Sequence, residues 1–181
     1  MINRYCMAAL ALFATGGAAT AQAPDPDTQA SFVRLTGDGL AAGQPGLHAY
    51  ASFRFGISRA EATRSVADLS GGVSATGVSR NCGARPLAFA RVGTLTLYFR
   101  NQRFVGWSLA GPRARRPVET EWGTGIGARR HEVAGGDMET PVFRRTARGT
   151  EFDADGMHGL MSPGPRGRVT AIWAGETCRG R

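Results

Sequence analysis

The stretch Thr94-Leu95-Thr96-Leu97-Tyr98-Phe99-Arg100, then Asn101-Gln102, then Arg103-Phe104-Val105-Gly106-Trp107-Ser108-Leu109, is the most informative segment of this sequence. Before the Asn-Gln pair, the leucines and the phenylalanine alternate with polar or amphipathic residues. This period of two is typical of a half-buried β-strand. After the pair, the valine, the tryptophan and the final leucine keep the same spacing. We therefore predict an antiparallel hairpin whose turn is Asn101-Gln102.

The residues before this hairpin predict a short helix. Ser58-Arg59-Ala60-Glu61 is a capping-box pattern, in which the serine hydroxyl and the glutamate carboxylate satisfy free backbone amides at a helix start. A modest apolar face follows, and Gly71-Gly72 ends it, so we expect a helix from about Arg59 to Leu69. Further upstream, Ser31 to Thr36 is predicted to be a strand, and the glycine-rich segment from Gly37 to Gly46 a loop.

The second half of the chain repeats this plan in weaker form. Gly56-Ile57 aligns with Gly125-Ile126, and Arg168 to Gly175 resembles Arg103 to Gly111. The offsets of 69, 65 and 64 residues are those of a duplicated unit with small deletions, although coincidence in a chain with 26 glycines is the alternative. A short helix is predicted at Ala128 to Ala134. Strand-like segments follow at Pro141 to Thr146, Glu151 to Phe152, Gly159 to Met161 and Arg168 to Trp173.

The order of these motifs resembles a known architecture. Phe-Gly-Ile-Ser-x-x-Glu-Ala from Phe55, a glycine pair, and Leu-x-Leu-x-Phe-x-Asn-x-x-Phe-Val-Gly-Trp from Leu95 are similar to one repeat of the β-lactamase inhibitor protein fold. The small lipoprotein of the outer-membrane β-barrel assembly machinery has a similar unit. The resemblance covers Phe55 to Gly111 and, more weakly, Gly125 to Gly175. It implies an α+β fold of two tandem units, each a short helix or helical hairpin followed by an antiparallel β-meander.

The first residues indicate that the chain is exported. Arg4, an apolar run from Met7 to Ala14 and small residues up to Ala23 form a signal-peptide pattern, with cleavage expected after Ala21. No second stretch is long and apolar enough to cross a membrane. The domain organisation we predict is a signal peptide at 1–21, a mobile leader and glycine-rich loop at 22–49, a first α+β unit at 50–112, a basic connector at 113–121 and a second α+β unit at 122–181, with the two units packed as one domain.

Cleavage has a consequence for the cysteines, because it removes Cys6 and leaves Cys82 and Cys178. In an oxidising compartment such as the periplasm, an isolated pair is most simply a disulfide. A reactive thiol is the alternative, but neither cysteine has a C-x-x-C motif or an evident local base. The sequence therefore predicts a disulfide-bonded periplasmic or secreted protein.

The charge of the chain is strongly basic, at +8, and every basic residue is arginine. Such a field favours an envelope protein or an anionic envelope component as partner, with a plain solvated surface as the alternative. Export argues against nucleic acid. Tryptophans anchor many interfaces, although the spacing of Trp107 and Trp173 within their strands favours core packing. The speculative binding residues are Trp107, Trp122, Trp173, Arg115, Arg116, Arg144 and Arg145.

Motifs for catalysis, metals and cofactors are weak throughout. The histidines lack metal-ligand spacing, and Glu151 to Gly156 only partly fits a calcium loop because Ser162 stands where the closing glutamate belongs. No cofactor motif is present. We therefore expect a non-enzymatic binding protein of the cell envelope. The alternative is a hydrolase of an envelope polymer, for which Glu119, Glu121 and Glu139 are the only loosely grouped carboxylates in the middle of the chain.

Overall fold

A computed structural model describes residues 32–43, 50–67, 72–80, 82, 85–112, 118–135 and 140–178. The predicted signal peptide and the arginines at 113–116 lie outside these residues, as do most of the leader and Glu139.

The largest element is an eight-stranded antiparallel sheet with the strand order β4-β5-β6-β7-β12-β11-β10-β9. The predicted hairpin is confirmed at its centre, and its turn residues Asn101 and Gln102 have φ of 49° and 60°, as a tight hairpin turn requires. The strands are β4 (Ala75–Ser79), β5 (Leu87–Val92), β6 (Leu95–Arg100), β7 (Arg103–Ala110), β9 (Val142–Thr146), β10 (Gly149–Ala154), β11 (Met157–Met161) and β12 (Val169–Gly175).

The predicted α+β class is wrong, because the described chain is mostly β. It has twelve strands in two sheets, while α1 (Arg59–Ala67) and α2 (Arg130–Ala134) are helices of only 9 and 5 residues. The second sheet has the order β3-β2-β1-β8, with β1 (Phe32–Thr36), β2 (Gly39–Gly43), β3 (Tyr50–Arg54) and β8 (Glu119–Thr120).

The predicted glycine-rich loop was one source of this error. Residues Gly39–Gly43 form β2, which pairs with β1 on one side and β3 on the other. A run of glycine and alanine has little intrinsic strand preference, so here the partners on both sides fix the extended conformation. The helix α1 begins where predicted, and Ser58 accepts a hydrogen bond from the amide of Glu61 at 3.2 Å.

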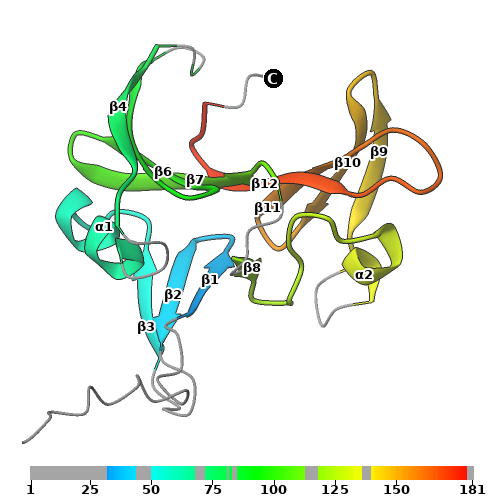
Figure 1. Cartoon of the computed structure of the whole chain (residues 1–181), viewed down its shortest axis with the longest axis horizontal. Helices are drawn as coiled ribbons and strands as arrows, with labels where there is room; N and C mark the ends of the chain where they lie inside the picture. The colour runs from blue at the N-terminus through cyan, green and yellow to red at the C-terminus, as the bar shows by residue number, and fades with distance from the viewer. Residues whose placement is uncertain are drawn as a thin grey trace, which may run out of the picture.

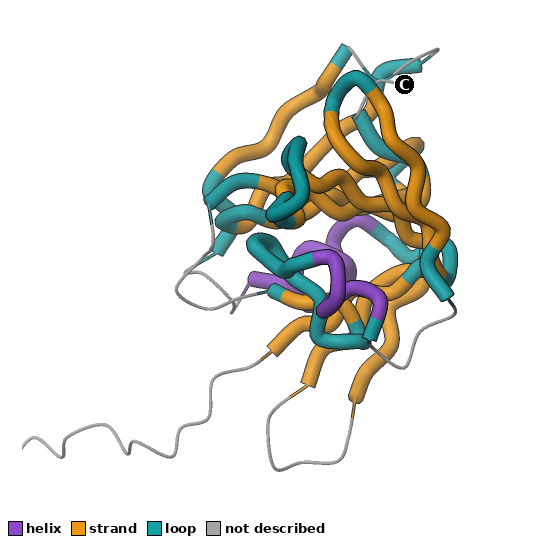
Figure 2. Tube along the Cα trace, turned by 90° about the vertical axis from the view of Figure 1, so that its right-hand side faces the viewer, coloured by secondary structure: helices purple, strands orange, loops and turns teal. Residues whose placement is uncertain are grey.

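All the smaller elements lie on one face of the eight-stranded sheet (Figure 1). The helix α1, the four-stranded sheet and α2 form a layer beneath it, and the view from the side shows the helices close under the long strands (Figure 2). The core between the layers holds Leu35 and Leu40 from the small sheet, Val66 from α1 and Trp107 from β7. The indole Nε1 of Trp107 donates to the carbonyl of Thr36 at 3.0 Å, which joins the two layers.

The two halves of the large sheet meet between β7 and β12 around an approximate two-fold axis. Across the two strands, Trp107 pairs with Ala174, Leu109 with Ile172 and Ser108 with Trp173. Similar hydrogen bonds also flank both helices. Phe104 and Ile57 bond through their backbones at 2.9 Å, as do Val169 and Ala128. Arg103 donates to the carbonyl of Gly56, and Arg168 to that of Gly127, at 3.1 and 2.8 Å.

The predicted disulfide is present between Cys82 and Cys178. After β12 the chain turns across the uncovered face of the large sheet, and the amide of Glu176 bonds to the carbonyl of Val105 at 2.8 Å. This approach requires Gly106, because a Cβ there would lie 2.2 Å from the carbonyl oxygen of Glu176. We call residues 176–178 the C-terminal strap.

Candidate functional site: the open face of the eight-stranded sheet

The face of the large sheet that points away from the helices and the small sheet is the candidate site. Side chains alternate between the two faces of a strand, and the registers place Val142, Asp153, His158 and Trp173 in one row across β9, β10, β11 and β12. We call these four residues the open-face row. Phe152 and Ile172 show which face these residues occupy. Both are buried in the core, so the next residue of each strand, Asp153 or Trp173, belongs to the opposite face.

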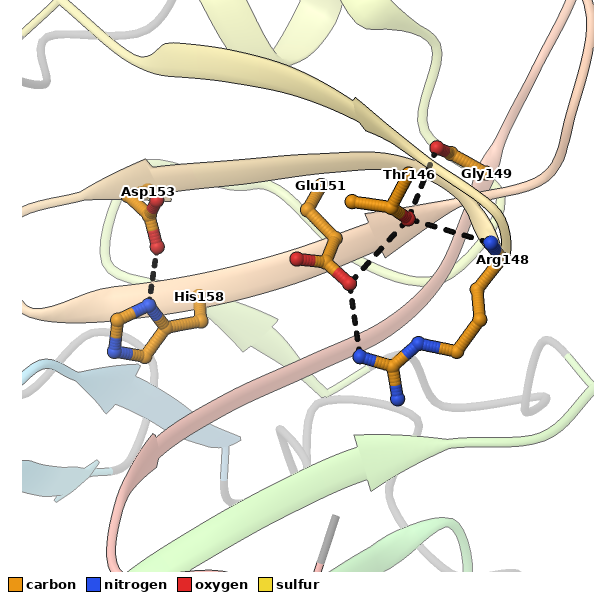
Figure 3. A network of polar contacts seen from close by, with 6 residues as sticks. All are labelled: Thr146, Arg148, Gly149, Glu151, Asp153 and His158. Carbon is orange, nitrogen blue, oxygen red and sulfur yellow. Dashed lines mark hydrogen bonds and ion pairs between the residues drawn. The ribbon is translucent and has the colours of Figure 1, made fainter. Parts of the chain in front are cut away.

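The aromatic pair at the centre of the row is held in place. The rings of His158 and Trp173 stack with their centroids 5.9 Å apart and their planes 28° apart. The imidazole Nδ1 contacts Oδ1 of Asp153, and the side chains of His158 and Asp153 are 49% and 40% exposed (Figure 3). The half-buried indole of Trp173 thus stacks on His158, and the position of His158 is fixed by its contact with the Asp153 carboxylate.

A second polar group lies beside the row. The guanidinium of Arg148 donates to Oε1 of Glu151 at 2.9 Å, and the amide of Arg148 donates to the Thr146 hydroxyl at 3.3 Å (Figure 3). At the edge of the same sheet, the side chain of Val142 is 54% exposed. An apolar and aromatic centre with a charged rim is the composition of many protein interfaces.

The C-terminal strap covers some of this face over the other half of the sheet. Tyr98 and Ser108 lie on this side and share a buried hydrogen bond of 3.1 Å. Arg100 forms an ion pair with Glu176 of the strap, with Nη1 3.0 Å from Oε1. The open-face row lies in the other half of the sheet, across β9 to β12.

The three tryptophans singled out from the sequence have three different positions. Trp107 is fully buried, as its strand spacing predicted, and Trp122 is partly buried against the core. The core packing predicted for Trp173 is wrong, because Ile172 and Ala174 of the same strand fill the core. A shift of one residue moves a side chain to the opposite face of a sheet.

The predicted arginines also separate. In the strand register, Arg144 lies opposite Glu151, on the open face. Arg145 lies opposite Thr150 and belongs to the other face of the sheet. Arg115 and Arg116 lie outside the described residues. Sequence reasoning did not find His158 or Asp153 as binding residues. Both residues lie at the same distance from the Asp155-Gly156 turn. A tight turn places such residues opposite one another, so this spacing is the signal that would have paired them.

The neighbours of the Asp153–His158 pair are an aromatic ring and a hydroxyl that is already hydrogen-bonded. The Asp153–His158 pair lies against an indole, and the hydroxyl of Ser108, the nearest in the register, is bonded to Tyr98 instead. A metal would need three or more ligands, and the described stretches of the chain contain no such group of His, Cys, Asp or Glu.

The carboxylates named for a hydrolase lie elsewhere. Glu119 belongs to β8, and Glu121 follows that strand. Loss of solvation raises the pKa of Glu121, and repulsion from Asp155 and Asp38 raises the pKa further.

Among the described residues, no helix is both long and apolar enough to span a bilayer. Comparison of the chain with models of protein families, with curated proteins and with solved structures finds no match.

Proposed function

We propose that this chain is an exported, non-catalytic binding protein of the cell envelope, and that a partner protein docks on the open-face row. The observation that carries the proposal is Trp173, a partly exposed indole stacked on His158 on the sheet face that points away from the helices and the small sheet. Tryptophan in such a position is a frequent binding hot spot.

The bracing of the indole supports this role. Ordering a side chain on binding costs about 0.5–1.5 kcal/mol. Trp173 is already ordered by His158, and His158 by Asp153, so much of that cost is met before binding. The exposed Val142 extends the apolar surface to the sheet edge.

Export is supported by two independent features. The N-terminal residues fit a signal peptide, and the two cysteines that remain after cleavage form a disulfide, the state expected in the periplasm or outside the cell.

We also propose that the chain arose by internal duplication. The support is the mirrored strand order of the two halves of the large sheet, together with the repeated arginine-to-carbonyl bonds of Arg103 and Arg168. The offset of 65 residues at these arginines is one that the sequence alone suggested. The resemblance to the β-lactamase inhibitor protein superfamily remains a prediction.

The test is capture from a periplasmic extract by the immobilised protein. We expect a retained protein that is lost with Trp173→Ala and retained with Val78→Ser, a matched control that alters a 63% exposed residue on the opposite edge strand. Capture that is the same for wild type and Trp173→Ala would reject the open-face row as the binding site.

A further inference from the structure

A pocket lies on the side of the large sheet opposite the open-face row. It measures about 490 Å³ and is formed by the β9–β10 hairpin, α2 and the loop at residues 162–167 that follows β11. Volumes of roughly 300–1,000 Å³ are typical of sites for small molecules. The pocket is therefore larger than a simple inorganic ion needs.

Two arginines line this pocket and are placed by different elements. Arg130 belongs to α2, and its guanidinium lies 4.1 Å from the ring centroid of Phe143 on β9. Arg145 is two residues further along the same strand, so it projects on the same side of the sheet as Phe143. Both arginines thus line the pocket on this side of the sheet.

The stacking of Arg130 matters for ligand binding. A guanidinium that rests on an aromatic ring uses its flat face, while its N–H donors point outward in the plane. Among the described residues, neither Arg130 nor Arg145 has a carboxylate partner, in contrast to Arg54, Arg100 and Arg148. None of the described residues that line the pocket is acidic. The site therefore carries two positive charges with unused donors.

The remaining walls add neutral donors and a fixed shape. Thr150 and Ser162 contribute hydroxyl groups, and the buried Met161 forms an apolar patch of the lining. The loop is braced by its own backbone, because the amide of Ser162 donates to the carbonyl of Arg168 at 2.9 Å and the amide of Gly167 to that of Gly164 at 3.1 Å. A pocket that is formed before the ligand arrives avoids the cost of ordering it.

We propose that this pocket binds a phosphate group carried on a small organic moiety. Two unpaired guanidinium groups match a phosphate dianion in charge, and arginine pairs with phosphate through two parallel hydrogen bonds. The methionine and the prolines at 163 and 165 provide contacts for the organic moiety. This site lies on the other side of the sheet from Trp173, so the inference does not depend on the proposed function.

The test is calorimetric titration of the purified full chain with glycerol 3-phosphate, inorganic phosphate and glycerate. We expect glycerol 3-phosphate to bind most tightly and Arg130→Gln and Arg145→Gln each to weaken binding by about tenfold or more, since hydrogen bonds to charged groups are strong. Arg91→Gln is the matched control. Arg91 also stacks on a phenylalanine, Phe89, at 5.9 Å, but lies outside the pocket. The affinity of this control should equal that of wild type.

Vesicles separate the two sources of a phosphate group. Retention on phosphatidylglycerol vesicles but not on phosphatidylcholine vesicles, lost with Arg145→Gln, would support the site and identify a lipid head group as its ligand. Binding of glycerate as tight as that of glycerol 3-phosphate would overturn the phosphate assignment. The assignment would also be overturned if neither the soluble esters at millimolar concentration nor the vesicles bound the protein. Equal affinities for wild type and both pocket variants would overturn it as well.

Discussion

Removal of the disulfide between Cys82 and Cys178 is expected to cost a large fraction of the stability of this fold. The bond spans a sequence separation of 96 residues. The loop-entropy relation gives about 4.7 kcal/mol at 25 °C for a loop of this size. Small domains have a total free energy of unfolding of about 5–15 kcal/mol, so the variant Cys82→Ser/Cys178→Ser should be marginally stable.

Contacts in the folded state add little to this value. The strap that the bond holds contributes the backbone bond from Glu176 to Val105 and the ion pair with Arg100, whose side chain is 33% exposed. Ion pairs at such exposure contribute about 0–1 kcal/mol. The effect of the disulfide should therefore come mainly from the unfolded chain.

Urea denaturation of the oxidised wild type and of the double serine variant measures this effect. We expect a loss of about 4–5 kcal/mol in the free energy of unfolding and a larger m-value, because an unlinked unfolded chain exposes more surface. Reduced wild type should behave like the variant. A loss below about 1 kcal/mol with an unchanged m-value would refute this reasoning.

Two further substitutions test the core and the acidic group. Trp107→Phe should lower the free energy of unfolding by about 2–3 kcal/mol, because it leaves a cavity and removes the hydrogen bond to the Thr36 carbonyl. Urea denaturation measures this loss, and a change within about 0.5 kcal/mol would contradict the prediction. Glu121→Gln should stabilise the protein at about pH 7 by less than about 1 kcal/mol. Burial of Glu121 and repulsion from Asp155 and Asp38 raise the pKa of this carboxyl in the folded state. The folded protein therefore favours the neutral carboxyl, and its contribution to stability is lost as the pH rises through the folded pKa. The gain should vanish at about pH 3, where the carboxyl is neutral in both states, and equal gains in Tm at both pH values would contradict the assignment.

The sequence predicted the elements whose pattern is carried by strong local signals. The hairpin β6–β7 has strict alternation of large apolar residues, and the start of α1 has a capping serine that bonds as expected. The strand β2 was missed because its glycines and alanines have no such pattern. Its extended form depends on β1 and β3, which are contacts that only the folded chain provides.

The candidate site was only partly predictable. Trp173 was expected to be a core residue like Trp107, since the spacing of apolar residues placed both on the apolar side of their strands. In the structure the two-fold partner of Trp107 is Ile172, and Trp173 is placed opposite Ser108 on the open face. The register between β7 and β12 decides this difference, and a register between distant strands is not encoded in either strand alone.

Photo-crosslinking in the cell envelope tests the central claim, that a partner protein binds the open-face row. A photoreactive amino acid replaces either Val142, next to Asp153 in the row, or Val78 on the opposite edge strand; both residues are exposed, at 54% and 63%. We predict a discrete adduct from position 142 that disappears with Trp173→Ala, and no such adduct from position 78. Absence of an adduct at position 142, or the same adduct from both positions, would contradict the claim.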